Sequence, residues 1–210
     1  MSNQLIETIK KRRSQYALGK VLPISVSETT QLIQEAVRLA PSSFNSQSSR
    51  AVILFGEQSV EFWEMVKATL RKMVPAEAFA ATEAKIDSFA AGAGTVLFYE
   101  DQSVVTGLQE KFPLYADNFP VWSEQASGMA QFAVWAALAG ADIGASLQHY
   151  NPLVDTEVAE RWNIPASWKL RAQMPFGTNV KAFGDKTFMD DAERFRVFGM
   201  PAAHDERIAA

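Results

Sequence analysis

A serine-rich stretch at residues 41–50, P-S-S-F-N-S-Q-S-S-R, has the strongest potential for chemistry in this sequence. Its five serines, with Asn45 and Gln47, supply many hydrogen-bond donors and acceptors, which suits the edges of a planar heterocycle and hydroxyl groups. The stretch follows apolar residues at helical spacing and precedes a continuous apolar run at 51–55. We therefore expect a binding loop between a helix and a core strand. A turn whose side chains satisfy only their own backbone remains the alternative.

Positive charge is concentrated at two places far apart in the chain. One cluster is K-K-R-R at 10–13, and the other is the pair Arg194 and Arg196. Cations at the end of a helix are favoured by the helix dipole, so the first cluster is explained either by a helix end or by a phosphate site.

Other reactive residues are few. There is no cysteine, so disulfides and cysteine-ligated metals are excluded. The two histidines, His149 and His204, are too few for a histidine-rich metal site. The adjacent carboxylates Glu100 and Asp101 follow an apolar run, and their position indicates capping of the next helix more than acid–base catalysis.

Composition indicates one globular domain spanning residues 1–210, with 48% hydrophobic and 21% charged residues. The formal net charge of −4 argues against a nucleic-acid or membrane-surface partner. Residues 1–13 lack the pattern of a secretory signal, and no window approaches the roughly 18 apolar residues of a membrane span. We therefore expect a cytoplasmic protein.

The elements that must position these residues follow from hydrophobic spacing and capping signals. Ser2 is predicted to cap the first helix, which would bury Leu5, Ile6 and Ile9, and Ser27 is predicted to cap the second. Helices are predicted at 3–13, from 27 to about 40, and at 59–73, 76–90, 103–112, 121–139 and 156–162; strands are predicted at 51–55, 95–99, 168–174 (ended by P-F-G at 175–177) and 194–198.

The helix at 121–139 is apolar around most of its circumference, which predicts burial on every side. In a chain of this size, burial between the sheet and a second subunit is the simplest solution, so we predict a homodimer. Burial inside a single large core is the alternative.

Taken in order, R-R-S at 12–14, P-S-S-x-N-S-Q at 41–47, the long apolar helix, Q-H-Y-N-P at 148–152, P-F-G and the terminal R-x-R resemble the FMN-dependent nitroreductase family. Within it, the short chain and its E-R-F-R-V-F ending are similar to the bacterial and fungal proteins related to the fatty-acid repression mutant protein. The resemblance implies an α+β three-layer sandwich, in which helices flank a mixed, mostly antiparallel sheet and a long central helix lies at the interface of a homodimer.

The resemblance also implies that FMN is bound between the subunits. Arginine binds phosphate through several charge-assisted hydrogen bonds, so both basic clusters would serve one phosphate. The implied FMN-binding residues are Arg12, Arg13, Ser14, Tyr16, Ser42, Ser43, Asn45, Gln47, Leu147, Gln148, His149, Lys186, Arg194 and Arg196. Tyr16 stands where better-known members commonly carry a lysine near the flavin, and Lys20 or Arg50 are candidates to replace that charge.

The reaction implied is a ping-pong hydride transfer through flavin N5, from NADH or NADPH to a nitroaromatic or quinone acceptor. It requires no catalytic side chain, because the cofactor carries the chemistry. A flavin-binding regulatory protein with little turnover is the alternative function.

Overall fold

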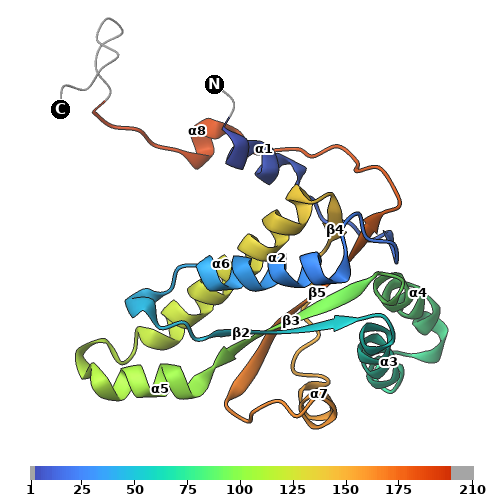
Figure 1. Ribbon diagram of the computed structural model, residues 1–210, viewed down its shortest axis with the longest axis horizontal. Helices are drawn as coiled ribbons and strands as arrows, with labels where there is room; N and C mark the ends of the chain where they lie inside the picture. Colours follow the sequence, from blue (N-terminus) through green and yellow to red (C-terminus); the bar gives the residue numbers. More distant parts are fainter. Residues whose placement is uncertain (1–2, 200–210) are drawn as a thin grey trace, which may run out of the picture.

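The computed structural model describes residues 3–199, and their centre is a five-stranded sheet (Figure 1). The order is β1-β5-β3-β2, with β4 also paired to β5, and every strand pairing is antiparallel. The strands are β1 (Leu18–Gly19), β2 (Ser49–Phe55), β3 (Gly94–Asp101), β4 (Ile143–Ala145) and β5 (Trp168–Asn179). Within residues 3–199, the parallel pairing is a single bridge between Ser14 and Ala145. The predicted mostly antiparallel sheet is confirmed.

Helices cover both faces of this sheet, because β3 is apolar on both sides and all of its residues are buried. On one face α2 (Val26–Leu39) and α6 (Phe119–Gly140) pack Ile33, Val134 and Leu138 against the strands, and α1 (Gln4–Lys11) lies on α6. On the other face α3 (Glu57–Arg71), α4 (Phe79–Ala90) and α7 (Asp155–Arg161) form the second core cluster. The predicted α+β three-layer sandwich is confirmed (Figure 1).

The remaining elements lie at the ends of the sandwich. Helix α5 (Gln102–Lys111) follows β3 directly, and short 3-10 turns occur at η1 (Ser43–Asn45), η2 (Ala76–Ala78) and η3 (Pro113–Tyr115). Helix α8 (Asp191–Arg194) lies at the end of an extended segment that follows β5 and leads away from the sandwich (Figure 1).

The N-caps of α1 and α2 are not the predicted serines. Asn3 caps α1 by accepting the Leu5 N–H at 2.9 Å, and the predicted cap, Ser2, lies outside the described residues. The helix ends at Lys11, so Arg12 and Arg13 lie beyond it. Ser25, not Ser27, caps α2, because Glu28 stands three residues later and completes a capping box.

Two predicted strand features near the C-terminus are also wrong. Strand β5 does not end at P-F-G but runs through Pro175 to Asn179; proline cannot donate, yet its carbonyl still accepts the Ser146 N–H at 3.3 Å. Arg194 ends α8 instead of starting an edge strand, and residues 195–198 form no strand. Alternation of charged and apolar residues predicts a strand only where a sheet edge is available to pair with it.

Helix α6 is the longest helix of the described chain, and the single chain leaves part of it exposed, which contradicts the alternative of burial inside one large core. Met129 and Phe132 are 39% and 43% exposed. Leu5 and Ile6 of α1, also predicted buried, are 61% and 47% exposed. An apolar face therefore remains uncovered on α1 and α6.

Candidate functional site

The segment 12–16 runs along the edge of the sheet after α1 ends. Ser14 bridges to Ala145 of β4, and the Gln15 N–H donates to the Ala145 carbonyl at 2.9 Å. This pairing holds Arg12 and Arg13 on a fixed backbone. The Arg12 guanidinium lies 4.4 Å from the centre of the Trp135 ring, and Arg13 donates to the Gly184 carbonyl at 2.8 Å.

The charges of Arg12 and Arg13 are not compensated by neighbouring carboxylates. Across residues 3–199 neither arginine forms an ion pair. Burial lowers the pKa of Arg12, and the adjacent positive charge of Arg13 lowers it further. A bound anion would relieve both effects, so this pair has the electrostatics of an anion site.

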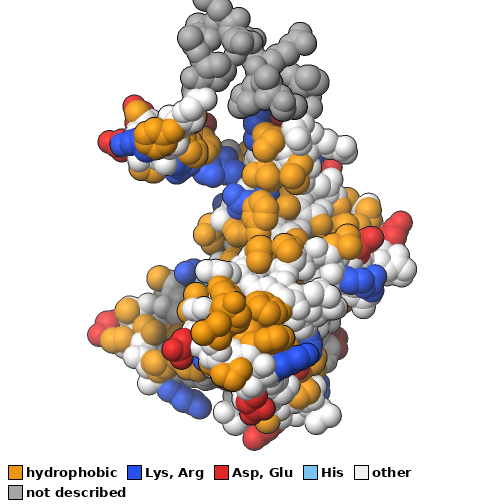
Figure 2. Space-filling view, turned by 90° about the vertical axis from the view of Figure 1, so that its left-hand side faces the viewer, with side chains coloured by type: hydrophobic (Ala, Val, Ile, Leu, Met, Phe, Trp, Pro, Cys, Tyr) orange, Lys and Arg blue, Asp and Glu red, His pale blue; other side chains and the backbone are white. Residues whose placement is uncertain are grey.

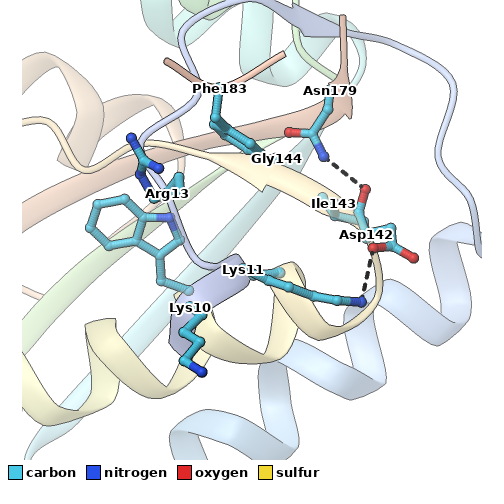
Figure 3. A pocket seen from close by; sticks show the side chains of 10 residues that line it. Lys10, Lys11, Arg13, Asp142, Ile143, Gly144, Asn179 and Phe183 are labelled. Carbon is cyan, nitrogen blue, oxygen red and sulfur yellow. Dashed lines mark hydrogen bonds and ion pairs between the residues drawn. The ribbon is translucent and has the colours of Figure 1, made fainter. Parts of the chain in front are cut away.

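A pocket of about 250 Å³ opens beside Arg13, between α1, the end of α6 and the start of β4 (Figure 3). Lys10 and Lys11 add positive charge to its rim, although Lys11 lies 3.5 Å from Asp142. Two polar atoms in residues that line the pocket, Trp135 Nε1 and Asn179 Oδ1, are buried without a hydrogen-bond partner in the described chain. Such unpaired atoms are costly unless a ligand or water satisfies them.

The loop at 41–47 has an unusual backbone. Phe44, Asn45 and Gln47 all have positive φ, at 57°, 48° and 49°, which non-glycine residues adopt at a cost and which tends to occur at functional sites. The Ser42 hydroxyl accepts the Gln47 N–H at 3.0 Å, so this serine does serve the loop's own backbone. Asn45 and Gln47 are exposed, and Ser42 and Ser43 are half-buried.

The segment 147–149 continues from β4 past the sheet edge. The Gln148 backbone is fully used, donating to and accepting from Gln173 at 2.7 and 2.9 Å, and its buried side chain donates to Ser146 Oγ at 3.0 Å. Leu147 is half-buried and His149 is exposed. A backbone N–H for a ligand must therefore come from Leu147 or His149.

The predicted C-terminal cations do not meet Arg12 and Arg13 in the single chain. Lys186, Arg194 and Arg196 are exposed on the segment after β5, and Arg196 donates to the carbonyls of Ala192 and Phe195. Helix α8, which contains Arg194, projects from the body beyond α1 (Figure 1).

The loop and the arginine pair also lie apart. Figure 1 shows η1, within the loop, at one end of α2, whereas β1 and β4, which flank the segment 12–16, lie at its other end. Fourteen helical residues span about 21 Å. One chain therefore presents two separate halves of the predicted site.

Between the two halves is an open apolar groove of about 680 Å³, here called the α1–α2–α6 groove. It is lined by Leu5 and Thr8 of α1, Ala36, Leu39, Ala40 and Pro41 at the end of α2, and Met129, Phe132, Ala133, Ala136, Ala137 and Gly140 of α6. Figure 2, which views the molecule from the left of Figure 1, shows hydrophobic side chains exposed in a nearly continuous band on this face. Exposed apolar patches of this kind mark interaction surfaces.

Residues 9–178, most of the chain, match the model of the nitroreductase family. The chain belongs to this family. Membership supports an oxidoreductase activity and confirms the family resemblance drawn from the sequence motifs.

Nitroreductase CinD from Lactococcus lactis is 50–51% identical, covering 92% of this chain and 99% of its own. It superimposes with TM-scores of 0.84–0.86 in complexes with chloramphenicol, nicotinic acid and 4-nitrophenol. The protein named HBN1 from Saccharomyces cerevisiae is 35% identical over 90% of this chain and 96% of its own length. A nitroreductase-fold protein from Desulfovibrio desulfuricans in complex with FMN has a TM-score of 0.68 and 19% identity, covering 96% of this chain and 100% of its own, which shows likeness of fold alone.

Three residues of the candidate site in the present chain were not predicted from its sequence. Trp135 supports Arg12, Asn179 lines the pocket beside Arg13, and Gln15, only 5% exposed, accepts the Ala17 N–H and donates to the Lys181 carbonyl at 2.7 Å. Only the flanking R-R-S motif pointed toward Gln15, and nothing in the local sequence distinguished Trp135 or Asn179 from core residues.

No helix among residues 3–199 is long and apolar enough to cross a membrane. The same residues contain no cluster of three histidine, aspartate or glutamate side chains able to hold a metal ion.

Proposed function

We propose that the protein is a homodimeric, FMN-dependent oxidoreductase that passes hydride from NADH or NADPH to nitroaromatic or quinone acceptors. The observation that carries this proposal is the separation of the arginine pair and the loop at opposite ends of α2, with the apolar groove between them. A second copy docked on the α1–α2–α6 groove would bring the loop of one chain to the arginine pair of the other. Two equivalent sites would result, each built from both chains.

The residues present fit FMN. Arg12 and Arg13 supply uncompensated positive charge for a phosphate dianion, and the unpaired Trp135 Nε1–H is a further donor nearby. The FMN phosphate would also be bound by Lys186, Arg194 and Arg196 when the extended C-terminal segment packs against the second chain. Ser42, Ser43, Asn45 and Gln47 would bind the ribityl hydroxyls and ring edge, and the backbone of Leu147 or His149 would face the ring.

When bound, FMN supplies the hydride-transfer chemistry at its N5 atom. The chain's own residues have three tasks: to hold the phosphate, to orient the ring and to leave one face of the ring open. NADH or NADPH and the acceptor would use that face in turn, which gives ping-pong kinetics. Tyr16 is 53% exposed and packs on Phe89, with ring centroids 6.5 Å apart. Its neutral hydroxyl would stand near the ring in place of a lysine.

The acceptor class is supported by the relative CinD, whose complexes contain two nitroaromatic compounds and a pyridine carboxylate. Flat aromatic acceptors also suit the four aromatic side chains that surround Phe44 beside the loop.

The test is to purify the protein, record its visible spectrum with added FMN, and follow bleaching of the ~450 nm band by NADH and NADPH in stopped flow. The proposal predicts a bound yellow flavin that bleaches rapidly and is reoxidised by 4-nitrophenol. A protein that takes up no FMN would contradict the flavin assignment. A flavoprotein whose bleaching is far slower than any useful turnover would support the regulatory alternative.

A further inference from the structure

Glu100, at the end of β3, is fully buried at 0% exposure and is surrounded by serine hydroxyls. Ser48 Oγ and Ser123 Oγ donate to Oε2 at 2.5 and 2.8 Å, and Ser49 Oγ donates to Oε1. A carboxylate that loses all contact with water needs such compensation, and hydrogen bonds to a charged group are the strong ones. These three serines therefore belong to one unit centred on Glu100.

The three serines come from two different parts of the candidate site. Ser48 and Ser49 immediately follow Gln47, so they fix the end of the strained loop. Ser123 lies near the start of α6, next to Trp122. One side chain thus ties the loop to the beginning of the long helix.

The neighbouring Asp101 holds the same loop from its other side. Its N–H donates to the Ser48 carbonyl at 2.9 Å, and its carboxylate accepts from Arg50 at 3.0 Å. Arg50 in turn donates to the Gln47 carbonyl at 2.5 Å. Asp101 also caps α5, as predicted, through the Ser103 N–H. Arg50 is therefore committed to holding the loop and is not free to replace the lysine near a flavin.

A cluster of five aromatic side chains, here called the aromatic wall, is formed by the loop (Phe44), the connection from α5 to α6 (Phe112 and Tyr115) and the start of α6 (Phe119 and Trp122). Phe44 is its centre, with ring centroids 5.0, 5.9, 5.3 and 6.0 Å from those of Phe112, Tyr115, Phe119 and Trp122. Phe44 and Tyr115 are 51% and 40% exposed, so the wall presents flat apolar surface to a ligand. Its Phe44 belongs to the loop and its Trp122 to α6, the two elements that Glu100 joins.

We propose that Glu100 is a positioning residue that couples the flavin-binding loop to the aromatic wall, and that this wall receives the aromatic acceptor. The inference rests on the proposed function, because it assumes that the loop binds FMN. Through Ser49 the carboxylate fixes the loop with its Phe44, and through Ser123 it fixes the start of α6 with its Trp122. The distance between the flavin and the acceptor surface would then depend on this buried carboxylate, while Asp101 holds the loop from its other side.

The hydrogen bonds from Glu100 to the loop and to α6 can be removed separately. Ser49→Ala removes a loop contact and keeps Ser123, whereas Ser123→Ala frees the start of α6 and keeps both loop serines. Ser127→Ala is the matched control, because Ser127 is a buried serine one turn further along α6 whose partner is Gln131. For Glu100→Gln the control is Glu124→Gln, which removes a carboxylate on α6 that is paired with Arg171.

Four quantities are measured on each folded dimer: the FMN dissociation constant, KM and kcat for 4-nitrophenol at saturating FMN, and the thermal midpoint. Loss of one hydrogen bond to a charged group corresponds to about tenfold in an equilibrium constant. We expect Ser49→Ala to raise the FMN dissociation constant about tenfold with a smaller change in KM. We expect Ser123→Ala to raise KM about tenfold while kcat and the FMN dissociation constant change less than about twofold. Glu100→Gln should raise both the FMN dissociation constant and KM, and the two control variants should change neither.

Equal changes of both constants in the two serine variants, or changes no larger than in Ser127→Ala, would overturn the inference and leave Glu100 as a core residue. That result differs from failure of the proposed function, which would show as absence of FMN binding in the unaltered protein. If Glu100→Gln does not fold, the two serine variants still decide the question.

Discussion

Arg12 and Trp135 form a stacked pair in which the guanidinium carbon lies 4.4 Å from the ring centroid. The residues come from the end of α1 and from α6, and the contact aims a side chain that has no carboxylate partner within residues 3–199. Stacking of this kind restricts the arginine to one orientation without neutralising its charge. The charge stays available for an anion.

The first prediction concerns Trp135. Trp135→Ala should weaken FMN binding by roughly 2- to 30-fold, the range expected from losing a cation–π contact of about 0.5–2 kcal/mol. Trp135→Phe keeps an aromatic platform, so it should lose less affinity and report the contribution of the indole N–H. Fluorescence titration with FMN measures both. Trp162→Ala, on the opposite face of the sheet, is the control and should leave FMN affinity unchanged; equal losses in all three variants would mean that Trp135 acts only through stability.

The second prediction concerns the phosphate. Replacing Arg12 and Arg196 together by Ala should strip FMN on dialysis while the fold remains, because each charge-assisted hydrogen bond contributes about 1.5–3 kcal/mol. The control replaces Arg71 of α3 and Arg161 of α7, which are already paired with Glu83 and Glu61, and removes the same total charge. Retention of full flavin occupancy by the Arg12/Arg196 variant would show that the phosphate binds elsewhere.

The third prediction concerns the dimer. Phe132→Glu places a charge in the α1–α2–α6 groove, where a second copy would have to bury it unpaired. The variant should elute as a monomer in size exclusion with light scattering, and it should lose FMN because each site of the proposed dimer is built from both chains. Met73→Glu alters a methionine that is 62% exposed outside the groove and should remain a flavin-bound dimer. A Phe132→Glu protein that is still dimeric would exclude this groove as the interface.

Much of this site could be predicted from sequence where the signal is local. Pro41 ends α2, and the apolar run after the loop marks β2, so the loop was placed correctly between them. Ser25 could have been recognised as the cap, since Glu28 follows at capping-box spacing. Interactions between distant segments could not be predicted. Arg12 and Trp135 are separated by 123 positions, and no local pattern around either residue indicates their contact. Likewise, the expected capping role for the carboxylate pair is confirmed for Asp101 but not for Glu100, whose partners Ser48, Ser49 and Ser123 are assembled only by the fold.

The fourth prediction concerns Asp155, at the start of α7, and the dependence of stability on pH. Burial raises the pKa of Asp155, although the positive charges of Arg171 and Lys169 partly oppose this. A raised pKa means that the folded protein disfavours the ionised carboxylate, and this cost is fully present above the folded pKa and disappears as the pH falls toward the unfolded value near 3.9. The nearby Tyr99 hydroxyl, whose pKa is raised by burial and then by the charge of Asp155, is buried without a partner in the described chain, as is Asp155 Oδ1.

Asp155→Asn removes this cost and should therefore raise the free energy of unfolding at pH 7. Its advantage over the unaltered protein should shrink as the pH is lowered toward 4.5, because the aspartate then begins to take up its proton in the folded state. Urea unfolding at fixed protein concentration across this pH range measures the difference. Asp117→Asn removes an exposed carboxylate and serves as the control. A constant advantage across the range would mean that the amide stabilises α7 through new hydrogen bonds, and a loss of stability at pH 7 would mean that the charge of Asp155 is favourable at the first turn of the helix.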